Sequence, residues 1–171
     1  MKRISLSFVI IIFCFFITQA QEIKSVKIGS QVWMARNLDI ATEGSHLYED
    51  NPEMGKKFGR LYTWDAANNS CPTGWNLPSE AEWNELIKNL GGEDAAGKEL
   101  KVGGTSEFNA LLGGLSSPGN YRLNGFYGTF WSSTNYDNEH AWYFYITSTS
   151  PNITCTYFSK LYGFSVRCIK K

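Results

Sequence analysis

The 171-residue chain lacks any excess of charge of one sign. It has 16 basic and 16 acidic residues, and no block of lysine or arginine occurs along it. Because a protein that binds nucleic acid by neutralising phosphates needs a basic patch, the composition argues against nucleic acid as a partner. After residue 20 the chain also lacks an apolar run long enough to cross a bilayer, which takes about 20 residues.

Signatures of catalysis are also missing. The only histidines are His46 and His140, which stand too far apart for zinc-ligand spacing. No nucleophile elbow and no phosphate-binding glycine loop occurs. Glu80, Glu82 and Glu85 could suggest paired catalytic carboxylates, but a solvated helix face explains them better. We therefore expect no enzymatic activity, with a site assembled from residues distant in the sequence as the alternative.

The first 20 residues have the three parts of a secretory signal peptide. Lys2 and Arg3 precede an apolar run from Phe8 to Ile17, and small residues at Thr18 and Ala20 suit a cleavage site. Ten apolar residues are too few for a membrane anchor. We predict cleavage after residue 20 and export to the periplasm, the cell surface or the medium. Residues 21–171 then form one domain, with 14 basic and 16 acidic residues.

One helix is predicted clearly, near the middle of the chain. Ser79 followed by Glu82 is a capping box, and Trp83, Leu86, Ile87 and Leu90 share one apolar face. Gly91 and Gly92 can end the helix by adopting positive φ. Residues 93–102 predict a second, weaker helix that Gly97 interrupts.

Strands and loops are predicted around these helices. Alternating residues on either side of Gly29-Ser30 predict two short strands within 22–38. Residues 39–57 predict a long loop and 113–128 a turn-rich segment, because both lack a sustained period. Apolar runs predict further strands at 59–64, 129–131, 141–146, 154–158 and 164–169. The chain is therefore expected to be α+β.

Four segments together resemble a known family. The segments VKIGSQVWMARNL, GRLYTWDAANNSCPTGWNLPSEAEWNEL, FWSSTNYDNEHAWYFYI and YGFSVRCIKK match, in order and spacing, the Fibrobacter succinogenes major paralogous domain of exported bacterial proteins. The segment LPSEAEW, with the late GF and VRC, is more distantly similar to the formylglycine-generating-enzyme superfamily. That likeness implies a C-type-lectin-like fold, with one main helix on a small irregular antiparallel sheet and long loops.

Three cysteines follow the predicted leader, and an exported protein is expected to form at least one disulfide. The family resemblance implies a bridge between Cys71 and Cys168. The alternative is a hairpin of the last two strands that places Cys155 opposite Cys168. The copper-binding cysteine pair of the oxidases in the distant superfamily has no matching context here, so activity of that kind is the least favoured function.

The segment WSSTNYDNEHAW offers the best candidate for binding. All six tryptophans and all nine tyrosines follow residue 20, and such rings can form a core or a ligand surface. We expect a non-enzymatic binding or adhesion module whose partner is a carbohydrate or an envelope protein, or a structural envelope domain without a small ligand. Oxygen-rich side chains suggest calcium, although a polar turn explains them better. The ligand candidates are Trp131, Asn135, Tyr136, Asp137 and Trp142, together with the segment 113–128, and the calcium candidates are Asn135, Asp137, Asn138 and Glu139.

Overall fold

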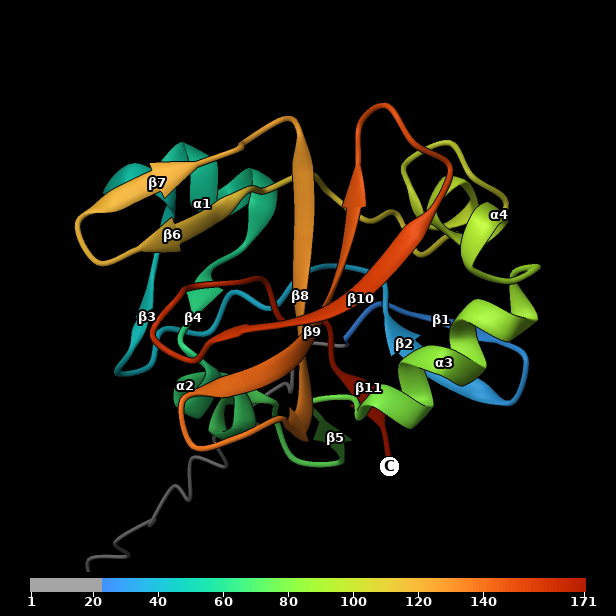
Figure 1. Ribbon diagram of the computed structural model, residues 1–171, viewed down its shortest axis with the longest axis horizontal. Helices are drawn as coiled ribbons and strands as arrows, with labels where there is room; N and C mark the ends of the chain where they lie inside the picture. Colours follow the sequence, from blue (N-terminus) through green and yellow to red (C-terminus); the bar gives the residue numbers. More distant parts are fainter. Residues whose placement is uncertain (1–22) are drawn as a thin grey trace, which may run out of the picture.

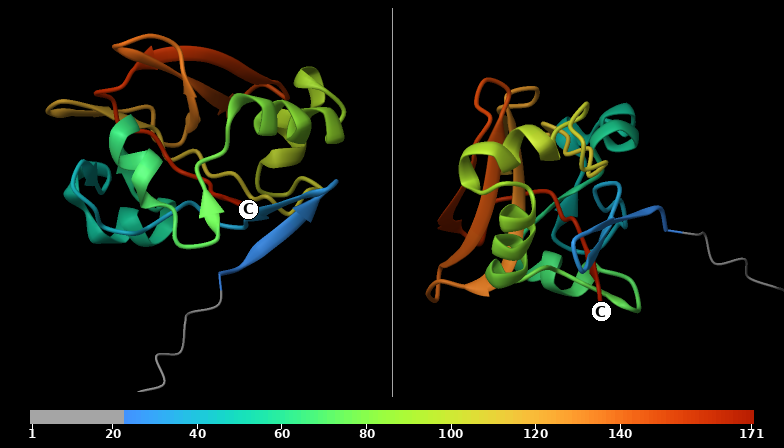
Figure 2. Two further views of the ribbon diagram at one scale, coloured as in Figure 1. Left: turned by 90° about the horizontal axis from the view of Figure 1, so that it is seen from below. Right: turned by 90° about the vertical axis from the view of Figure 1, so that its right-hand side faces the viewer.

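The computed structural model describes residues 23–171, so the predicted leader lies outside the described residues. This part of the chain is α+β, with four α-helices and several small antiparallel sheets. Two sheets lie on opposite sides of the molecule, and the C-terminal segment runs between them (Figures 1 and 2). None of the helices within residues 23–171 has the length and apolar character needed to span a membrane.

The first sheet joins the two ends of the domain. Strands β1 (Ser25–Ile28) and β2 (Gln31–Met34) form the hairpin expected around Gly29. The C-terminal strand β11 (Ile169–Lys170) lies between β2 and β5 (Trp75–Asn76), giving the order β1-β2-β11-β5. Because β11 pairs on both sides, the last residues of the chain hold the first strands in place.

The second sheet has the order β10-β9-β8 and contains the longest strands in the described residues (Figure 1). Strand β8 covers Tyr127–Asn135, β9 covers His140–Thr147 and β10 covers Ile153–Ser159. The register of β8 against β9 shifts between Trp131 and Asn135, which marks an irregularity of the β-bulge type. Bulges of this kind redirect side chains at the end of a sheet.

Helix α3 (Glu80–Asn89) begins and ends as its sequence predicts. The Ser79 hydroxyl accepts from the Glu82 N–H, and the Glu82 carboxylate accepts from the Ser79 N–H at 2.7 Å. The buried Trp83 ring packs against Trp33 and Phe144, with centroids 4.9 and 5.1 Å apart. Helix α3 thereby fills the space between the two sheets on one side of the molecule.

Helix α4 (Glu93–Leu100) continues through Gly97, which we had expected to interrupt it. A Cβ atom at Gly97 would overlap the backbone carbonyl of Asn152, just before β10. The glycine therefore allows close contact between this helix and the second sheet, and the cost of glycine in a helix is offset by that packing. Packing against the segment before β10, and not helix propensity, therefore explains why α4 continues through Gly97.

The segment 39–57 is not the long loop predicted from its composition. It contains β3 (Ser45–His46), a 3-10 helix at Tyr48–Asp50 and helix α1 (Pro52–Phe58). The Asn51 side chain caps α1 by accepting from the Glu53 N–H at 2.9 Å. Strand β3 pairs with β4 (Leu61–Tyr62), and α2 (Trp64–Ser70) follows. The elements are too short to produce a visible period in the sequence.

The segment 113–128 also contains regular structure that the prediction missed. Strands β6 (Leu115–Ser117) and β7 (Asn120–Arg122) form a hairpin, with Gly119 at φ 77° in its turn. Glycine takes this backbone conformation without a steric penalty. Tyr127 and Gly128 already belong to β8, and the rest of the segment is turn or irregular, as its glycine content indicates.

The predicted strand at 164–169 is mostly irregular, although all of its residues are buried. Only Ile169 belongs to a strand, while Phe164 and Ser165 make single bridges to Tyr62 and Phe130. This segment threads through the core and contacts both sheets (Figure 2). Its apolar composition therefore reflects burial and not a regular sheet.

Arg167 lies at the centre of this threaded segment and is completely buried. Its guanidinium donates to Asn37 Oδ1 through Nε and Nη2, and to the backbone carbonyls of Met34, Phe108 and Asn109. The guanidinium also lies 4.2 Å from the Phe108 ring centroid. All five N–H donors thus have partners, which lie on the two segments 34–37 and 108–109, and these bonds compensate much of the cost of burying the charge. Burial lowers the pKa of Arg167.

The structure forms the disulfide between Cys71 and Cys168, in agreement with the family resemblance. It links the segment before β5 to the residue after Arg167. The alternative hairpin does not form, because β10 pairs with β9 and Cys155 lies opposite Phe144. Cys155 is a free, partly buried thiol, and burial raises its pKa to about 12.

Replacing Arg167 with alanine is expected to lower the free energy of unfolding by about 3–5 kcal/mol, because three buried acceptors and one partly buried acceptor lose their donors. Urea denaturation followed by tryptophan fluorescence measures the change. Arg122, an exposed arginine in β7, is the control, and its alanine variant should stay within about 0.5 kcal/mol of the wild type. Equal stability of the Arg167 variant would contradict the assigned role.

Peptide mapping without reductant is expected to recover Cys71 linked to Cys168. Their sequence separation is 97 residues, and closing a loop of that length stabilises by about 4–5 kcal/mol in the chain-entropy model. Reduction should therefore lower the melting temperature of the wild type and of a Cys155→Ser control alike. A peptide linking Cys155 to Cys168 would show that the pairing is wrong.

Candidate functional site

Three aromatic side chains meet where the second sheet ends, beside the turn between β8 and β9. Tyr136 lies in that turn, while Trp142 and Tyr157 are direct partners in the β9–β10 register. The rings of Tyr136 and Tyr157 stack with centroids 3.8 Å apart and an interplanar angle of 3°. Trp142 meets both tyrosines edge to face, at 5.3 and 5.9 Å. We call these three residues the aromatic cluster.

The aromatic cluster is open to solvent even though its rings pack against one another. Tyr136 is 45% exposed and Tyr157 is 43% exposed, while Trp142 is partly buried. The Tyr157 hydroxyl, through hydrogen bonding and then through charge, raises the pKa of Tyr136. The cluster thus offers ring surface and phenol hydroxyls at one place, a combination suited to an amphipathic ligand.

The turn that carries Tyr136 is held by hydrogen bonds. Asp137 Oδ1 accepts from the backbone N–H groups of Glu139 and His140, at 2.8 and 2.7 Å. The His140 ring lies against the same carboxylate, with Nδ1 2.9 Å from Oδ1. The Glu139 N–H bond, and after it the bonds from His140, lower the pKa of Asp137. Asp137 therefore caps a turn, as the polar-turn interpretation of this segment expects.

Lys160 fixes the same turn from the other side. Its Nζ donates to the backbone carbonyl oxygens of Asp137 and Asn138 at 2.8 and 3.3 Å, and lies 4.5 Å from the Trp64 ring centroid. The Lys160 N–H also donates to the Glu139 carbonyl at 2.9 Å. Because both sides of the turn are held, Tyr136 needs little further ordering to receive a ligand.

Trp131 does not belong to this surface, which corrects the prediction. The side chain is 0% exposed, and its Nε1 donates to the Tyr62 carbonyl at 2.7 Å. Its ring packs on Phe164 with centroids 4.2 Å apart. Trp131 precedes the bulge in β8, whereas Asn135, Tyr136 and Asp137 follow it and are exposed. The segment 113–128 contributes none of the three residues of the cluster.

Tyr157 was missed by sequence reasoning. It lies within the predicted strand at 154–158, but only the register of β10 against β9 places it beside Trp142. An exposed tyrosine in a strand is no signal by itself, because such residues are common on sheets. The cluster could not be assembled without the pairing of the strands.

The calcium candidates lie on the turn between β8 and β9. The Asp137 carboxylate accepts bonds from Glu139 and His140, and Asn135, Asn138 and Glu139 are exposed. Within residues 23–171 no group of three or more His, Cys, Asp or Glu side chains gathers in a way that could hold a metal ion.

His46 and Ser116 are the other polar pair with potential chemistry, at a distance of 2.5 Å between Nε2 and Oγ. Burial lowers the pKa of His46; the nearby Asp50 opposes this shift and Arg60 adds to it. Ser116 is only 2% exposed, and its backbone pairs with Gly163 in both directions. Its hydroxyl therefore has no open approach for a substrate, and the pair ties the β6–β7 hairpin to β3.

Comparison with protein-family models matches residues 26–170 to the Fibrobacter succinogenes major domain. The chain belongs to this family. The match confirms the resemblance, and the family domain extends from β1 to β11. It includes the disulfide, Arg167 and the aromatic cluster. Comparisons with curated proteins and with solved structures find no match.

We expect calcium at about 5 mM to leave the melting temperature unchanged, although that concentration exceeds the roughly millimolar dissociation constants of extracellular calcium modules. The reason is that the Asp137 carboxylate serves the turn. Differential scanning fluorimetry in EDTA and then in calcium measures this. A rise in melting temperature that Asp137→Asn abolishes would contradict the turn-capping role.

Proposed function

We propose that this member of the Fibrobacter succinogenes major domain family is an exported, non-enzymatic binding module whose aromatic cluster contacts a carbohydrate. The observation that supports the proposal is the exposed stack of Tyr136 and Tyr157 with Trp142 at its edge. Aromatic rings offer a flat apolar face, and phenol hydroxyls and indole N–H groups add hydrogen bonds. A sugar presents C–H groups on one face and hydroxyls at its rim, which matches both features.

The surroundings of the cluster support a ligand contact and not simple core packing. Large aromatic side chains are normally buried, so two tyrosines exposed by more than 40% at one place are informative. The turn around Asp137 is held by Lys160 and His140, and a rigid site loses less conformational entropy on binding. The exposed Asn135 beside Tyr136 adds amide donors and acceptors.

The fold and the location are part of the same proposal. One well-formed helix, α3, packs on small irregular sheets with long connections, which supports a C-type-lectin-like arrangement. The leader at 1–20 and the disulfide support export, because disulfides persist in oxidising compartments. With Cys168 bridged to Cys71, Cys155 has no late cysteine partner, which supports the absence of a copper-oxidase site.

Replacing Tyr157 with alanine is expected to weaken carbohydrate binding at least about tenfold, because truncating a central aromatic contact typically costs more than about 1.4 kcal/mol. An array of immobilised oligosaccharides with neutral hexose, N-acetylhexosamine and uronic acid units identifies the ligand, and titration calorimetry measures the affinity. Tyr157→Phe keeps the ring and should retain most of the binding.

Phe126→Ala is the matched control, because Phe126 is an aromatic residue that is 63% exposed and lies outside the cluster. It should bind as the wild type does. Equal losses in the Phe126 and Tyr157 variants, or no binding of the wild type to any oligosaccharide, would contradict the proposal. The latter result would favour a structural envelope domain without a small ligand.

A further inference from the structure

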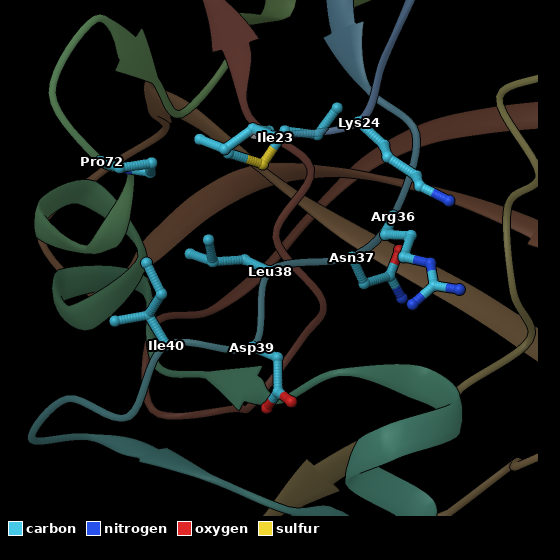
Figure 3. A pocket seen from close by; sticks show the side chains of 9 residues that line it. Ile23, Lys24, Arg36, Asn37, Leu38, Asp39, Ile40 and Pro72 are labelled. Atoms are coloured by element: carbon cyan, nitrogen blue, oxygen red, sulfur yellow. The ribbon is translucent and has the colours of Figure 1, made fainter. Parts of the chain in front are cut away.

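A groove follows the extended segment after β2, away from the aromatic cluster. One cleft of about 460 Å³ is lined by Lys24 and Pro72 among others, and a second of about 530 Å³ is lined by Lys56 and Leu111 among others. Arg36, Asn37 and Asp39 line both clefts, so the two clefts adjoin each other along this segment. Figure 3 shows the first cleft, with Ile40 and Pro72 on one side and Lys24 and Arg36 on the other. We call the whole feature the β2 groove.

The two ends of the β2 groove are apolar. Ile23 and Ile40 line the first cleft and are 36% and 42% exposed, and Met34 and Leu38 lie beneath them. At the other end, the strongly exposed Val102 lines the second cleft. Exposed apolar side chains that line a concave surface are typical of binding sites.

Cations outnumber acids in the combined lining of the two clefts. The lining includes the cations Lys24, Arg36, Lys56 and Lys57, but only one acid, Asp39. The whole chain has equal numbers of basic and acidic residues, so this concentration is local. Within residues 23–171 only Lys56 of these four has a carboxylate partner, Glu53 at 2.7 Å. A cleft with charges of one sign attracts a ligand of the opposite sign.

The backbone along the groove has unused donors. The Leu38 N–H donates to the Val166 carbonyl, and the Leu38 carbonyl accepts from the Arg60 N–H. In the described part of the chain, the N–H groups of Arg36 and Asp39 donate to no protein acceptor. Successive N–H groups of an extended segment point to opposite edges, so Asp39 lies on the edge opposite the bond from Leu38 to Val166. An extended chain on that edge could accept from the Asp39 N–H, as peptides do at open strand edges. Arg167 holds Asn37 between them, so the segment is rigid.

We infer that the β2 groove binds an extended acidic peptide segment of another protein. The peptide's carboxylates pair with Arg36, Lys24 and Lys57, and its apolar side chains contact the Ile23–Ile40 end and Val102. A peptide is favoured because the two adjoining clefts combine a backbone donor, exposed apolar side chains and an excess of cations along one extended segment. The inference does not rest on the carbohydrate proposal, since no residue of the aromatic cluster lines the groove.

The test uses the chain without its leader and two fluorescein-labelled peptides, acetyl-LELELE-amide and acetyl-LKLKLK-amide, in fluorescence anisotropy. The glutamate peptide should bind, and its affinity should fall as salt is raised, because the contacts are ionic. The lysine peptide should bind at least about tenfold more weakly, because its charges repel those of the groove. Arg36→Glu should weaken binding of the glutamate peptide by at least about tenfold.

Arg122→Glu is the matched control, because Arg122 is an exposed arginine outside the groove, and its affinity should change less than about twofold. Lys24→Glu is the second groove variant and covers the case in which Arg36→Glu fails to fold, as judged by its melting temperature. Absence of binding, equal binding of both peptides, or equal effects at Arg36 and Arg122 would overturn the inference. Binding to vesicles with anionic lipid but not to the glutamate peptide would overturn it as well.

Discussion

The structure depends on one buried cation that has no carboxylate partner. Arg167 is satisfied by a side-chain amide and by backbone carbonyls on the two segments 34–37 and 108–109, so its position specifies how those segments meet. Replacing Asn37 would leave two N–H donors of Arg167 unpaired in a place that water does not reach. The adjacent disulfide at Cys168 fixes the same segment covalently. The buried Arg167 and the Cys71–Cys168 disulfide together hold this irregular segment in the core, because the segment has little regular strand pairing to hold it.

The threaded C-terminal segment explains how such small sheets remain stable. Most of the strands in the described residues are short, and strands of two to four residues have little stability alone. Phe164, Ser165 and Ile169 each contact a different strand and so join separate sheets into one core. Both proposed surfaces use this arrangement, because the aromatic cluster lies at a sheet end and the β2 groove lies along an irregular segment.

The candidate sites illustrate how far residue patterns lead. The segment around Tyr136, Asp137 and Trp142 was identified from its aromatic and oxygen-rich composition. Trp131 was predicted to lie on this surface but is buried before the bulge in β8, whereas Tyr157 was not predicted to lie there and belongs to the cluster. The β9–β10 register places Tyr157 beside Trp142. The β2 groove had no sequence signal, since its cations come from three separate segments. Aromatic residues suit a core and an exposed sheet face equally, so composition alone cannot assign them.

Local chemistry is what the sequence determined by itself: the capping box and apolar face of α3, the β1–β2 hairpin, the α+β class and, through the motifs, the family. These features depend on residues close together in the chain, or on a pattern long enough to be specific. The tertiary structure decided the short elements within 39–57, the irregular course of 164–169, the burial of Trp131 and the charge of the groove. Each depends on contacts between distant segments, whose register no local preference encodes.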